Sequence, residues 1–209
     1  AFHADMVAGP NLDTEILKYL EKGTVVSATR VEPPLHPPGP EKIIKNFGVE
    51  AEEFNFNSWT DWCRNSNEQT KFNGKLTNGI FAPWCMYKED FLAVGGHDEL
   101  FAPQSREDSD LFNRFVLNGY KVLQTWEGLV YHFTSRGSRF NKHAGGDIMK
   151  DSPEWQKTNS KNERNFIRKW GSFPQTTTLM NPIIIPKYQI GIVIKNCNHN
   201  LLFNLEPFC

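Results

Sequence analysis

The chain has 209 residues, with 23 basic and 24 acidic side chains and a formal net charge of −1. That length suits one globular domain, because chains divide into several domains only beyond roughly 250–300 residues. A pI near 6.7 gives no general attraction to nucleic acid or to an anionic membrane surface. No stretch approaches the roughly 18 continuous apolar residues of a membrane helix. We therefore expect a globular domain with no nucleic-acid partner and no membrane span.

The cysteines indicate a reducing compartment. The four are widely spaced and form no CxxC pair, so we expect neither a zinc site nor a disulfide framework. The first residues also lack the basic region and apolar run of a signal peptide. Reduced thiols and a cytoplasmic location are therefore expected for Cys63, Cys85, Cys197 and Cys209.

The N-terminal third predicts a helix, a strand and a loop. Residues 11–23 predict a helix whose apolar face is formed by Ile16, Leu17 and Leu20 and which Gly23 ends. Residues 24–31 are rich in β-branched side chains and predict a strand. The proline-rich residues 33–40 cannot continue a ladder, because proline has no N–H to donate.

The middle of the chain alternates short strands and helices. A short helix is expected around Trp59 and Trp62, a strand within residues 77–86, and a helix over 88–94. Residues 106–118 predict a longer helix, because acidic side chains in its first turn complement the helix dipole.

Towards the C-terminus, two strands are expected at residues 120–125 and 129–133, and a helix from Ser152 to Gly171, where Ser152 caps and Pro153 begins it. Further strands are expected at 183–185 and 190–194, and a polar turn at 196–200. Helices that alternate with short apolar strands predict an α/β layer architecture.

Several residues carry chemistry, each with a simpler alternative. Asp5 offers an oxygen ligand for Mg²⁺ or Mn²⁺, or is a solvated or capping carboxylate. Glu107 and Asp108 offer a general base, or only compensate the helix dipole. His132 offers a metal-binding imidazole, or is a hydrogen-bonded core histidine. No P-loop, serine-hydrolase or zincin motif is present.

The order of these residues is more informative than any one of them. His3-Ala4-Asp5 is followed by Gly95-Gly96-His97-Asp98-Glu99-Leu100-Phe101, then by Arg106-Glu107-Asp108-Ser109-Asp110-Leu111, and last by Val130-Tyr131-His132. This series, over about residues 1–140, resembles the family 2 glycosyltransferases of the glycosyltransferase-A fold. Their pattern is a DxD-type motif, a GG-F-D-E segment, an E-D-x-D-L helix and a late histidine.

The resemblance implies roles for the metal and donor residues. Asp5 matches the last acid of the DxD motif and His132 the late histidine, so both would hold Mn²⁺ or Mg²⁺. His3 stands where the family usually has an aspartate that faces the donor ribose or the metal. Arg136 and Arg139 can add charge-assisted hydrogen bonds to the diphosphate of a UDP- or GDP-sugar donor; as loop arginines, their alternative is simple solvation.

The resemblance also implies roles on the acceptor side. Asp108 matches the catalytic base, and Glu107 would orient the base or an acceptor hydroxyl. Trp84, His97 and Asp98 would form the wall against a saccharide or other hydroxyl acceptor, with a core role equally open for Trp84. The expected reaction is a single displacement that inverts the anomeric centre.

The resemblance further implies a glycosyltransferase-A-like mixed sheet flanked by helices that lacks the N-terminal nucleotide-binding portion. Residues 1–150 would form the metal and acceptor part, and 151–209 a C-terminal helix and strand extension of the same domain. An uncovered sheet edge would favour a homo-oligomer. Two alternatives remain open, namely a non-catalytic carbohydrate-binding or assembly module of the same fold and a metal-dependent hydrolase.

Overall fold

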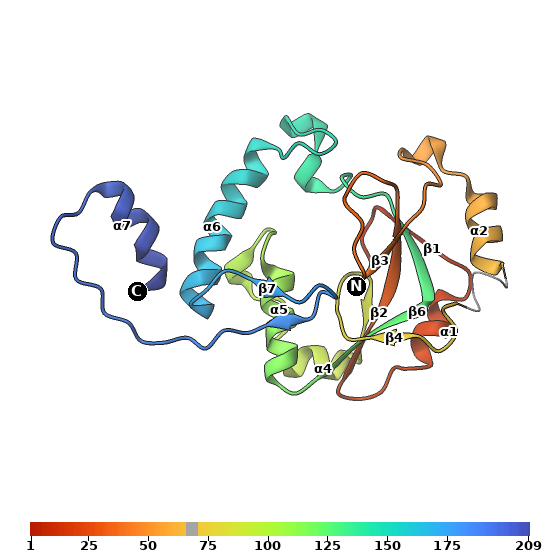
Figure 1. Ribbon diagram of the computed structural model, residues 1–209, viewed down its shortest axis with the longest axis horizontal. Helices are drawn as coiled ribbons and strands as arrows, with labels where there is room; N and C mark the ends of the chain where they lie inside the picture. Colours follow the sequence, from red (N-terminus) through yellow and green to blue (C-terminus); the bar gives the residue numbers. More distant parts are fainter. Residues whose placement is uncertain (66–70) are drawn as a thin grey trace.

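A mixed sheet of six strands forms the centre of the molecule (Figure 1). The computed structural model describes residues 1–65 and 71–209. The strand order is β1-β6-β2-β3, with β4 paired to β6 and β5 to β2. β2 is parallel to β3 and β6, whereas β1, β4 and β5 are antiparallel to their partners. The strands are β1 Met6–Ala8, β2 Thr24–Glu32, β3 Lys42–Ile44, β4 Leu76–Thr77, β5 Trp84–Cys85 and β6 Lys121–His132.

Helices cover both faces of this sheet, which confirms the expected α/β class. Successive β6 side chains point to opposite faces, and Val130 joins one hydrophobic cluster while Leu129 and Tyr131 join another. The first cluster takes in side chains of three helices, and the second takes in those of α2; Figure 1 shows α2 and α5 on opposite sides of the sheet. The helices are α1 Leu12–Leu17, α2 Phe56–Arg64, α4 Lys88–Ala93 and α5 Glu107–Leu117.

The long helix α6, Pro153–Trp170, lies on the α5 side of the molecule (Figure 1). Its start is as predicted, because the Ser152 hydroxyl accepts a hydrogen bond from the Trp155 N–H at 3.2 Å and Pro153 takes the first position. Gly171 ends it with a φ of 77°, which favours glycine. The ring of Phe166 packs on Phe101, so α6 is joined to the segment that precedes α5.

The remaining elements are short. Single 3-10 turns occur at Ala51–Glu53, Glu99–Phe101, Ser138–Phe140, Lys142–Ala144 and Glu206–Phe208. A small hairpin of β7 Gln175–Thr176 and β8 Pro182–Ile183 follows α6, and α7 His199–Leu205 lies beyond α6, farthest from the sheet (Figure 1). In residues 1–65 and 71–209, no helix is long and apolar enough to span a membrane.

Three predictions in the first two thirds were wrong in detail. The first helix ends at Leu17, which is exposed, and its buried side chains are Leu12 and Ile16, one turn apart. The strand expected within residues 77–86 is instead two short strands, β4 and β5. The two strands expected at residues 120–125 and 129–133 are one continuous strand, β6, whose pairing with β2 contains a register shift. β3 had no sequence signal, because its three residues lie in a polar stretch.

The C-terminal predictions were also partly wrong. Residues 190–194 form no strand, and Ile190, Ile192 and Val193 are exposed, because no described strand edge lies beside them to pair with. The expected polar turn at 196–200 contains a helix start instead. Asn198 caps α7 by accepting a hydrogen bond from the Leu201 N–H at 2.8 Å.

Candidate functional site

β2 and β6 end, and β1 begins, at one edge of the sheet, where Glu32, His132 and Asp5 place polar side chains. β2 and β6 are parallel with Val31 opposite Tyr131, so the next residues, Glu32 and His132, are neighbours. β1 is antiparallel to β6 and pairs Met6 with His132, so Asp5 arrives at the same edge. The Asp5 carbonyl accepts a hydrogen bond from the Phe133 N–H at 3.0 Å, which fixes its backbone there.

This edge brings Asp5 and His132, which the sequence predicted for a metal, together with His3, which it predicted for the donor. One ligand atom each from His3, Asp5 and His132 lies within 4.8 Å of the others. The His132 Nε2 atom is 3.5 Å from Asp5 Oδ2. A divalent cation placed between three such atoms would complete its shell with substrate oxygens or water. The donor set fits a transition ion better than Mg²⁺, because two of its three ligands are imidazole nitrogens.

Sequence reasoning missed Glu32, which is the most buried charged group at this edge. Its side chain is 1% exposed. It accepts from His132 Nδ1 at 2.9 Å, from Arg30 at 2.9 Å and from Lys42 at 2.8 Å. The sequence signal for Glu32 was an acid at the end of a strand rich in β-branched residues, since such a strand places its last side chain at the sheet edge.

The electrostatics of this edge follow from burial and pairing. Burial opposes ionisation of Glu32, but hydrogen bonds and charges from His132, Arg30 and Lys42 outweigh it and lower its pKa to about 2. The ionised Glu32 can only accept, so the His132 Nδ1 atom must carry the proton and Nε2 is left facing Asp5. Burial likewise opposes the charge of His132, but its hydrogen bonds to Asp5 and Glu32 raise its pKa.

The two acids predicted for catalysis, Glu107 and Asp108, are the first two residues of α5. The chain enters this helix through Ser105 and Arg106, both with the positive φ that non-glycine residues rarely adopt, at 77° and 71°. Side chains of α6 hold this entry. Arg106 pairs with Glu163 at 2.6 Å, and the Ser105 hydroxyl donates to Asn159 at 2.6 Å.

Another α6 side chain, Asn162, also holds the backbone segment that leads into α5. It is fully buried, and its amide donates to the carbonyls of Phe101 at 2.7 Å and Gln104 at 2.8 Å. Because strained backbone persists only where its surroundings hold it, α6 determines where α5 begins and hence where Glu107 and Asp108 point.

Both acids are better proton acceptors than ordinary surface carboxylates. Burial raises the pKa of Asp108, and nearby His3 and His97 oppose that rise only in part. Burial also raises the pKa of Glu107, and one of its carboxylate oxygens, Oε2, is enclosed without a hydrogen-bond partner. A raised carboxyl pKa in a cleft is the arrangement that general bases require.

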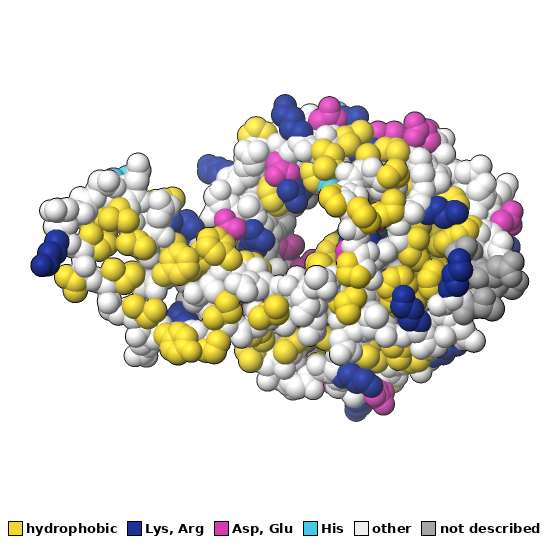
Figure 2. All heavy atoms as spheres, in the orientation of Figure 1, with side chains coloured by type: hydrophobic (Ala, Val, Ile, Leu, Met, Phe, Trp, Pro, Cys, Tyr) yellow, Lys and Arg dark blue, Asp and Glu magenta, His cyan; other side chains and the backbone are white. Residues whose placement is uncertain are grey.

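The three candidate cation ligands and the two acids at the start of α5 line one cleft of about 800 Å³. His3, Asp5 and His132 line it from the sheet edge, and Glu107 and Asp108 line it from α5. In Figure 2 the surface is hollowed between the part that carries α5 and α6 and the part that carries the sheet, with acidic side chains at the rim. All of the residues expected for metal and catalysis therefore share one space.

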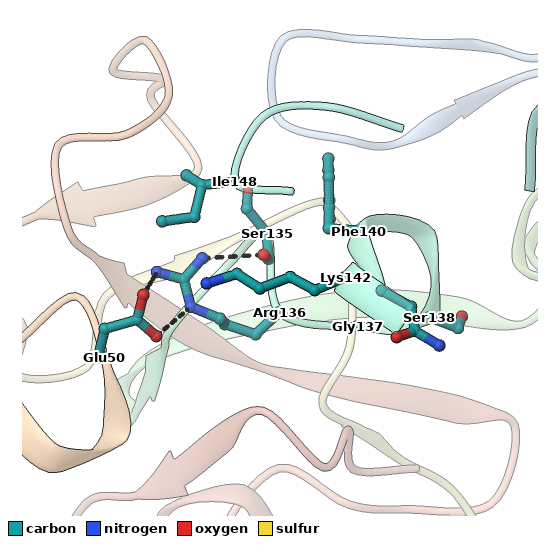
Figure 3. Close-up of a pocket in the computed structure, with 9 residues that line it drawn as sticks. Glu50, Ser135, Arg136, Gly137, Ser138, Phe140, Lys142 and Ile148 are labelled. Atoms are coloured by element: carbon teal, nitrogen blue, oxygen red, sulfur yellow. Dashed lines mark hydrogen bonds and ion pairs between the residues drawn. The ribbon is translucent and has the colours of Figure 1, made fainter. Parts of the chain in front are cut away.

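The predicted donor residues Arg136 and Arg139 line the same cleft, but both are paired with carboxylates. Figure 3 shows Arg136 between Glu50 and Ser135; it makes two bonds of 3.0 Å to the Glu50 carboxylate and one of 2.9 Å to the Ser135 carbonyl. Arg139 is paired in the same two-pronged way with Asp151. A phosphate group would have to replace these partners.

The predicted acceptor residues line a second cleft of about 530 Å³, which shares His3, Glu107 and Asp108 with the first. His97 is exposed there, and Asp98 pairs with Lys169 at 2.7 Å. Trp84 is only 7% exposed, and its ring packs on Phe91, Phe112 and Phe115, so the core role fits it better than a stacking role. The exposed aromatic ring of this cleft is Phe2, which sequence reasoning missed.

Comparison with known proteins supports the same chemistry. Residues 52–142 match the family model of chondroitin N-acetylgalactosaminyltransferase. The matched stretch is a little under half of the chain and contains Glu107, Asp108 and His132, but not His3, Asp5 or Glu32. The match indicates a glycosyltransferase, with a nucleotide-sugar donor and a saccharide acceptor; the narrower assignment to family 2 stays a prediction. No curated protein and no solved structure matches the chain.

Proposed function

We propose that the chain is an inverting, divalent-cation-dependent glycosyltransferase that moves a sugar from a nucleotide diphosphate to an acceptor hydroxyl. The observation that carries this proposal is the meeting of the two clefts at Glu107 and Asp108. The first cleft offers cation ligands and arginines for a nucleotide diphosphate, and the second offers room for an acceptor. A carboxylate at their junction is where a transferase needs its base.

In this proposal Asp108 takes the proton from the acceptor hydroxyl as the hydroxyl oxygen attacks the anomeric carbon. The attacking oxygen enters from the second cleft and the nucleotide diphosphate leaves into the first. Attack on the face opposite the leaving group inverts the anomeric centre. Glu107, with its enclosed and unpartnered oxygen, is placed to accept a hydrogen bond from a sugar hydroxyl and so to orient it.

His3, Asp5 and His132 would hold the cation, and Glu32 would keep His132 in the tautomer that binds it. When bound, a divalent cation neutralises charge that develops on the leaving diphosphate. Arg136 and Arg139 would exchange Glu50 and Asp151 for phosphate oxygens and add charge-assisted hydrogen bonds. Because the ligand set is rich in nitrogen, Mn²⁺ should bind more tightly than Mg²⁺.

The test is release of free nucleotide from a panel of UDP- and GDP-sugars, with Mn²⁺, with Mg²⁺ and with EDTA. We expect slow cation-dependent donor hydrolysis that an acceptor accelerates, with inverted anomeric configuration in the product by NMR. Asp5→Ala should abolish it, whereas Asp13→Ala, on exposed α1 surface, should not. Saccharide binding that survives EDTA, with no nucleotide released from any donor, would instead favour the non-catalytic binding module.

A further inference from the structure

One buried carboxylate of α5, that of Asp110, takes no part in the proposed reaction. Asp110 is 0% exposed and follows Asp108 by two residues, which places the two side chains about 200° apart around the helix axis. Asp108 lines the two clefts, whereas Asp110 contacts α6. Because a buried carboxylate needs cations or hydrogen-bond donors to offset its lost hydration, the partners of Asp110 show which parts of the molecule it joins.

Three side chains from two helices satisfy Asp110. The Trp170 Nε1–H donates to its Oδ1 at 2.9 Å, and the Lys169 ammonium lies 2.6 Å from the same oxygen. On α5 itself, the Arg114 Nε–H donates to Oδ2 at 2.9 Å, and Arg114 also donates to the carbonyl of Val94, directly after α4. The buried side of α5 is thereby fixed to the last two residues of α6.

The Lys169 ammonium is shared with a second carboxylate, that of Asp98. Lys169 donates to Asp98 Oδ2 at 2.7 Å, while Asp98 Oδ1 accepts from the Leu100 N–H at 2.9 Å. An ammonium group carries three N–H donors, so one lysine can bind carboxylates of two different elements. Asp98 lines the second cleft, whereas Lys169 lines neither cleft. Lys169 therefore connects the wall of the second cleft to the helix that carries the base.

We propose that Lys169 is a positioning residue for sugar transfer, which holds the Asp98 wall of the second cleft at a fixed distance from the helix that carries Asp108. This inference rests on the proposed function, because it takes the second cleft as the acceptor side and Asp108 as the base. Neither the motifs nor the family match, which ends at residue 142, includes Lys169. Spacing matters here because a 1 Å displacement of a catalytic group costs on the order of 100-fold in rate.

Removal of the Lys169 ammonium separates positioning from folding. In Lys169→Met, Asp110 keeps the hydrogen bonds from Trp170 and Arg114, so α5 stays packed on α6. Asp98 loses its cation, but its side chain is 33% exposed, so water can solvate the freed carboxylate. We therefore expect the variant to fold, with α5 in place and the segment around Asp98 less firmly held.

The experiment measures donor hydrolysis and sugar transfer separately, with Mn²⁺, the panel of UDP- and GDP-sugars, and the methyl glycosides of glucose, galactose, glucuronic acid and N-acetylglucosamine as acceptors. Lys169→Met is compared with Lys169→Arg, which keeps the charge and N–H donors. The matched control is Lys157→Met, at an exposed residue of the same helix that lines neither cleft. Hydrogen exchange, followed by mass spectrometry, reports on residues 95–104 and on α5 in each protein.

We expect Lys169→Met to lower the ratio of sugar transfer to donor hydrolysis at least about tenfold, because a saccharide needs the acceptor wall and water does not. The kcat for the saccharide should fall while its KM changes less, since Lys169 does not line the cleft. Lys169→Arg should recover part of the loss, and Lys157→Met should match the wild type. Exchange should be faster in residues 95–104 of Lys169→Met but not in α5.

Unchanged exchange in residues 95–104 of Lys169→Met would overturn the inference. Equal losses of transfer and hydrolysis, with faster exchange throughout α5, would also overturn it, because they would show a merely structural role; nucleotide release by the wild type would still uphold the transferase. Absence of nucleotide release from every donor in the wild type would overturn the proposed function itself, and this inference with it.

Discussion

Replacing Glu32 with glutamine tests the organisation of the cation site, because Glu32 reaches the site only through His132. Glutamine keeps a carbonyl acceptor of the same length but loses the charge that makes the group accept from three donors at once. Its amide must then present N–H groups to at least one of His132, Arg30 and Lys42. The His132 tautomer is no longer fixed, and Nε2 is no longer reserved for a cation.

Two magnitudes follow from this geometry. Loss of a carboxylate that orients a metal-binding histidine typically costs 10- to 100-fold in metal affinity, which is about 1.4–2.8 kcal/mol. Glu32→Gln also leaves Lys42, whose side chain is 9% exposed, with no carboxylate partner in the part of the chain that the structure describes, and breaking a buried pair costs about 3–5 kcal/mol of stability. Both losses should be visible in one variant, in separate measurements.

The assay is titration with Mn²⁺, followed by its paramagnetic resonance signal, alongside unfolding in urea. Lys42→Met is the matched control, because it breaks the same network at 2.8 Å from Glu32 but leaves the 2.9 Å contact of Glu32 with His132. We expect Lys42→Met to lose stability and keep Mn²⁺ affinity, and Glu32→Gln to lose both. Long-range ¹H–¹⁵N spectra should show the Nδ1–H tautomer of neutral His132 in the wild type only. Unchanged Mn²⁺ affinity in a folded Glu32→Gln variant would refute the reasoning.

Three further predictions concern the base, the entry to α5 and the thiols. Asp108→Asn should lower transfer by roughly 10²- to 10⁴-fold with Mn²⁺ binding intact. Because burial raises the pKa of Asp108, the wild-type rate should decrease as the pH is lowered, and the decrease should begin above the pH range in which ordinary aspartates titrate. If Asp108→Asn showed the same decrease at low pH, the assignment of Asp108 as the base would be contradicted. Asn162→Ala should lose about 2–5 kcal/mol of stability, because two buried carbonyls lose their donor, and it should also lower kcat. An unchanged midpoint of urea unfolding would show that Asn162 does not hold the segment that leads into α5. Burial raises the pKa of the Cys63 thiol to about 12, so iodoacetamide at pH 8 should alkylate the exposed Cys197 and Cys209 first. If mass spectrometry showed that Cys63 is alkylated equally fast, this would count against its burial.

The sequence predicted the layer architecture well where periodicity was strong, as in α5, α6 and β2. It failed where an element depends on a distant partner. Residues 190–194 have the alternation of a strand but no partner edge among the described residues, and β3 has no such pattern but lies beside β2 and pairs with it. A local pattern cannot report whether a hydrogen-bonding partner exists.

The candidate site was predicted in parts by the order of its motifs. His3, Asp5, His132, Glu107 and Asp108 do line one cleft. Glu32 was missed, because its significance depends on the parallel register that places β2 beside β6. The two arginines line the cleft as expected, but their pairing with Glu50 and Asp151 depends on contacts across the fold that no motif records.

The position of Trp84 has a consequence for how mutational scans of this protein are interpreted. The cation ligands belong to the sheet, the base belongs to α5, and Trp84 joins the two, since its backbone pairs with Ser27 of β2 and its ring packs on Phe112 and Phe115. Shortening Trp84 would leave a void between them, and even a 1 Å displacement of a catalytic group costs on the order of 100-fold in rate. Such a variant would mimic the loss of a sugar-binding residue although the defect is one of spacing. Refilling the void with a small apolar molecule, rather than adding more acceptor, would then restore the rate.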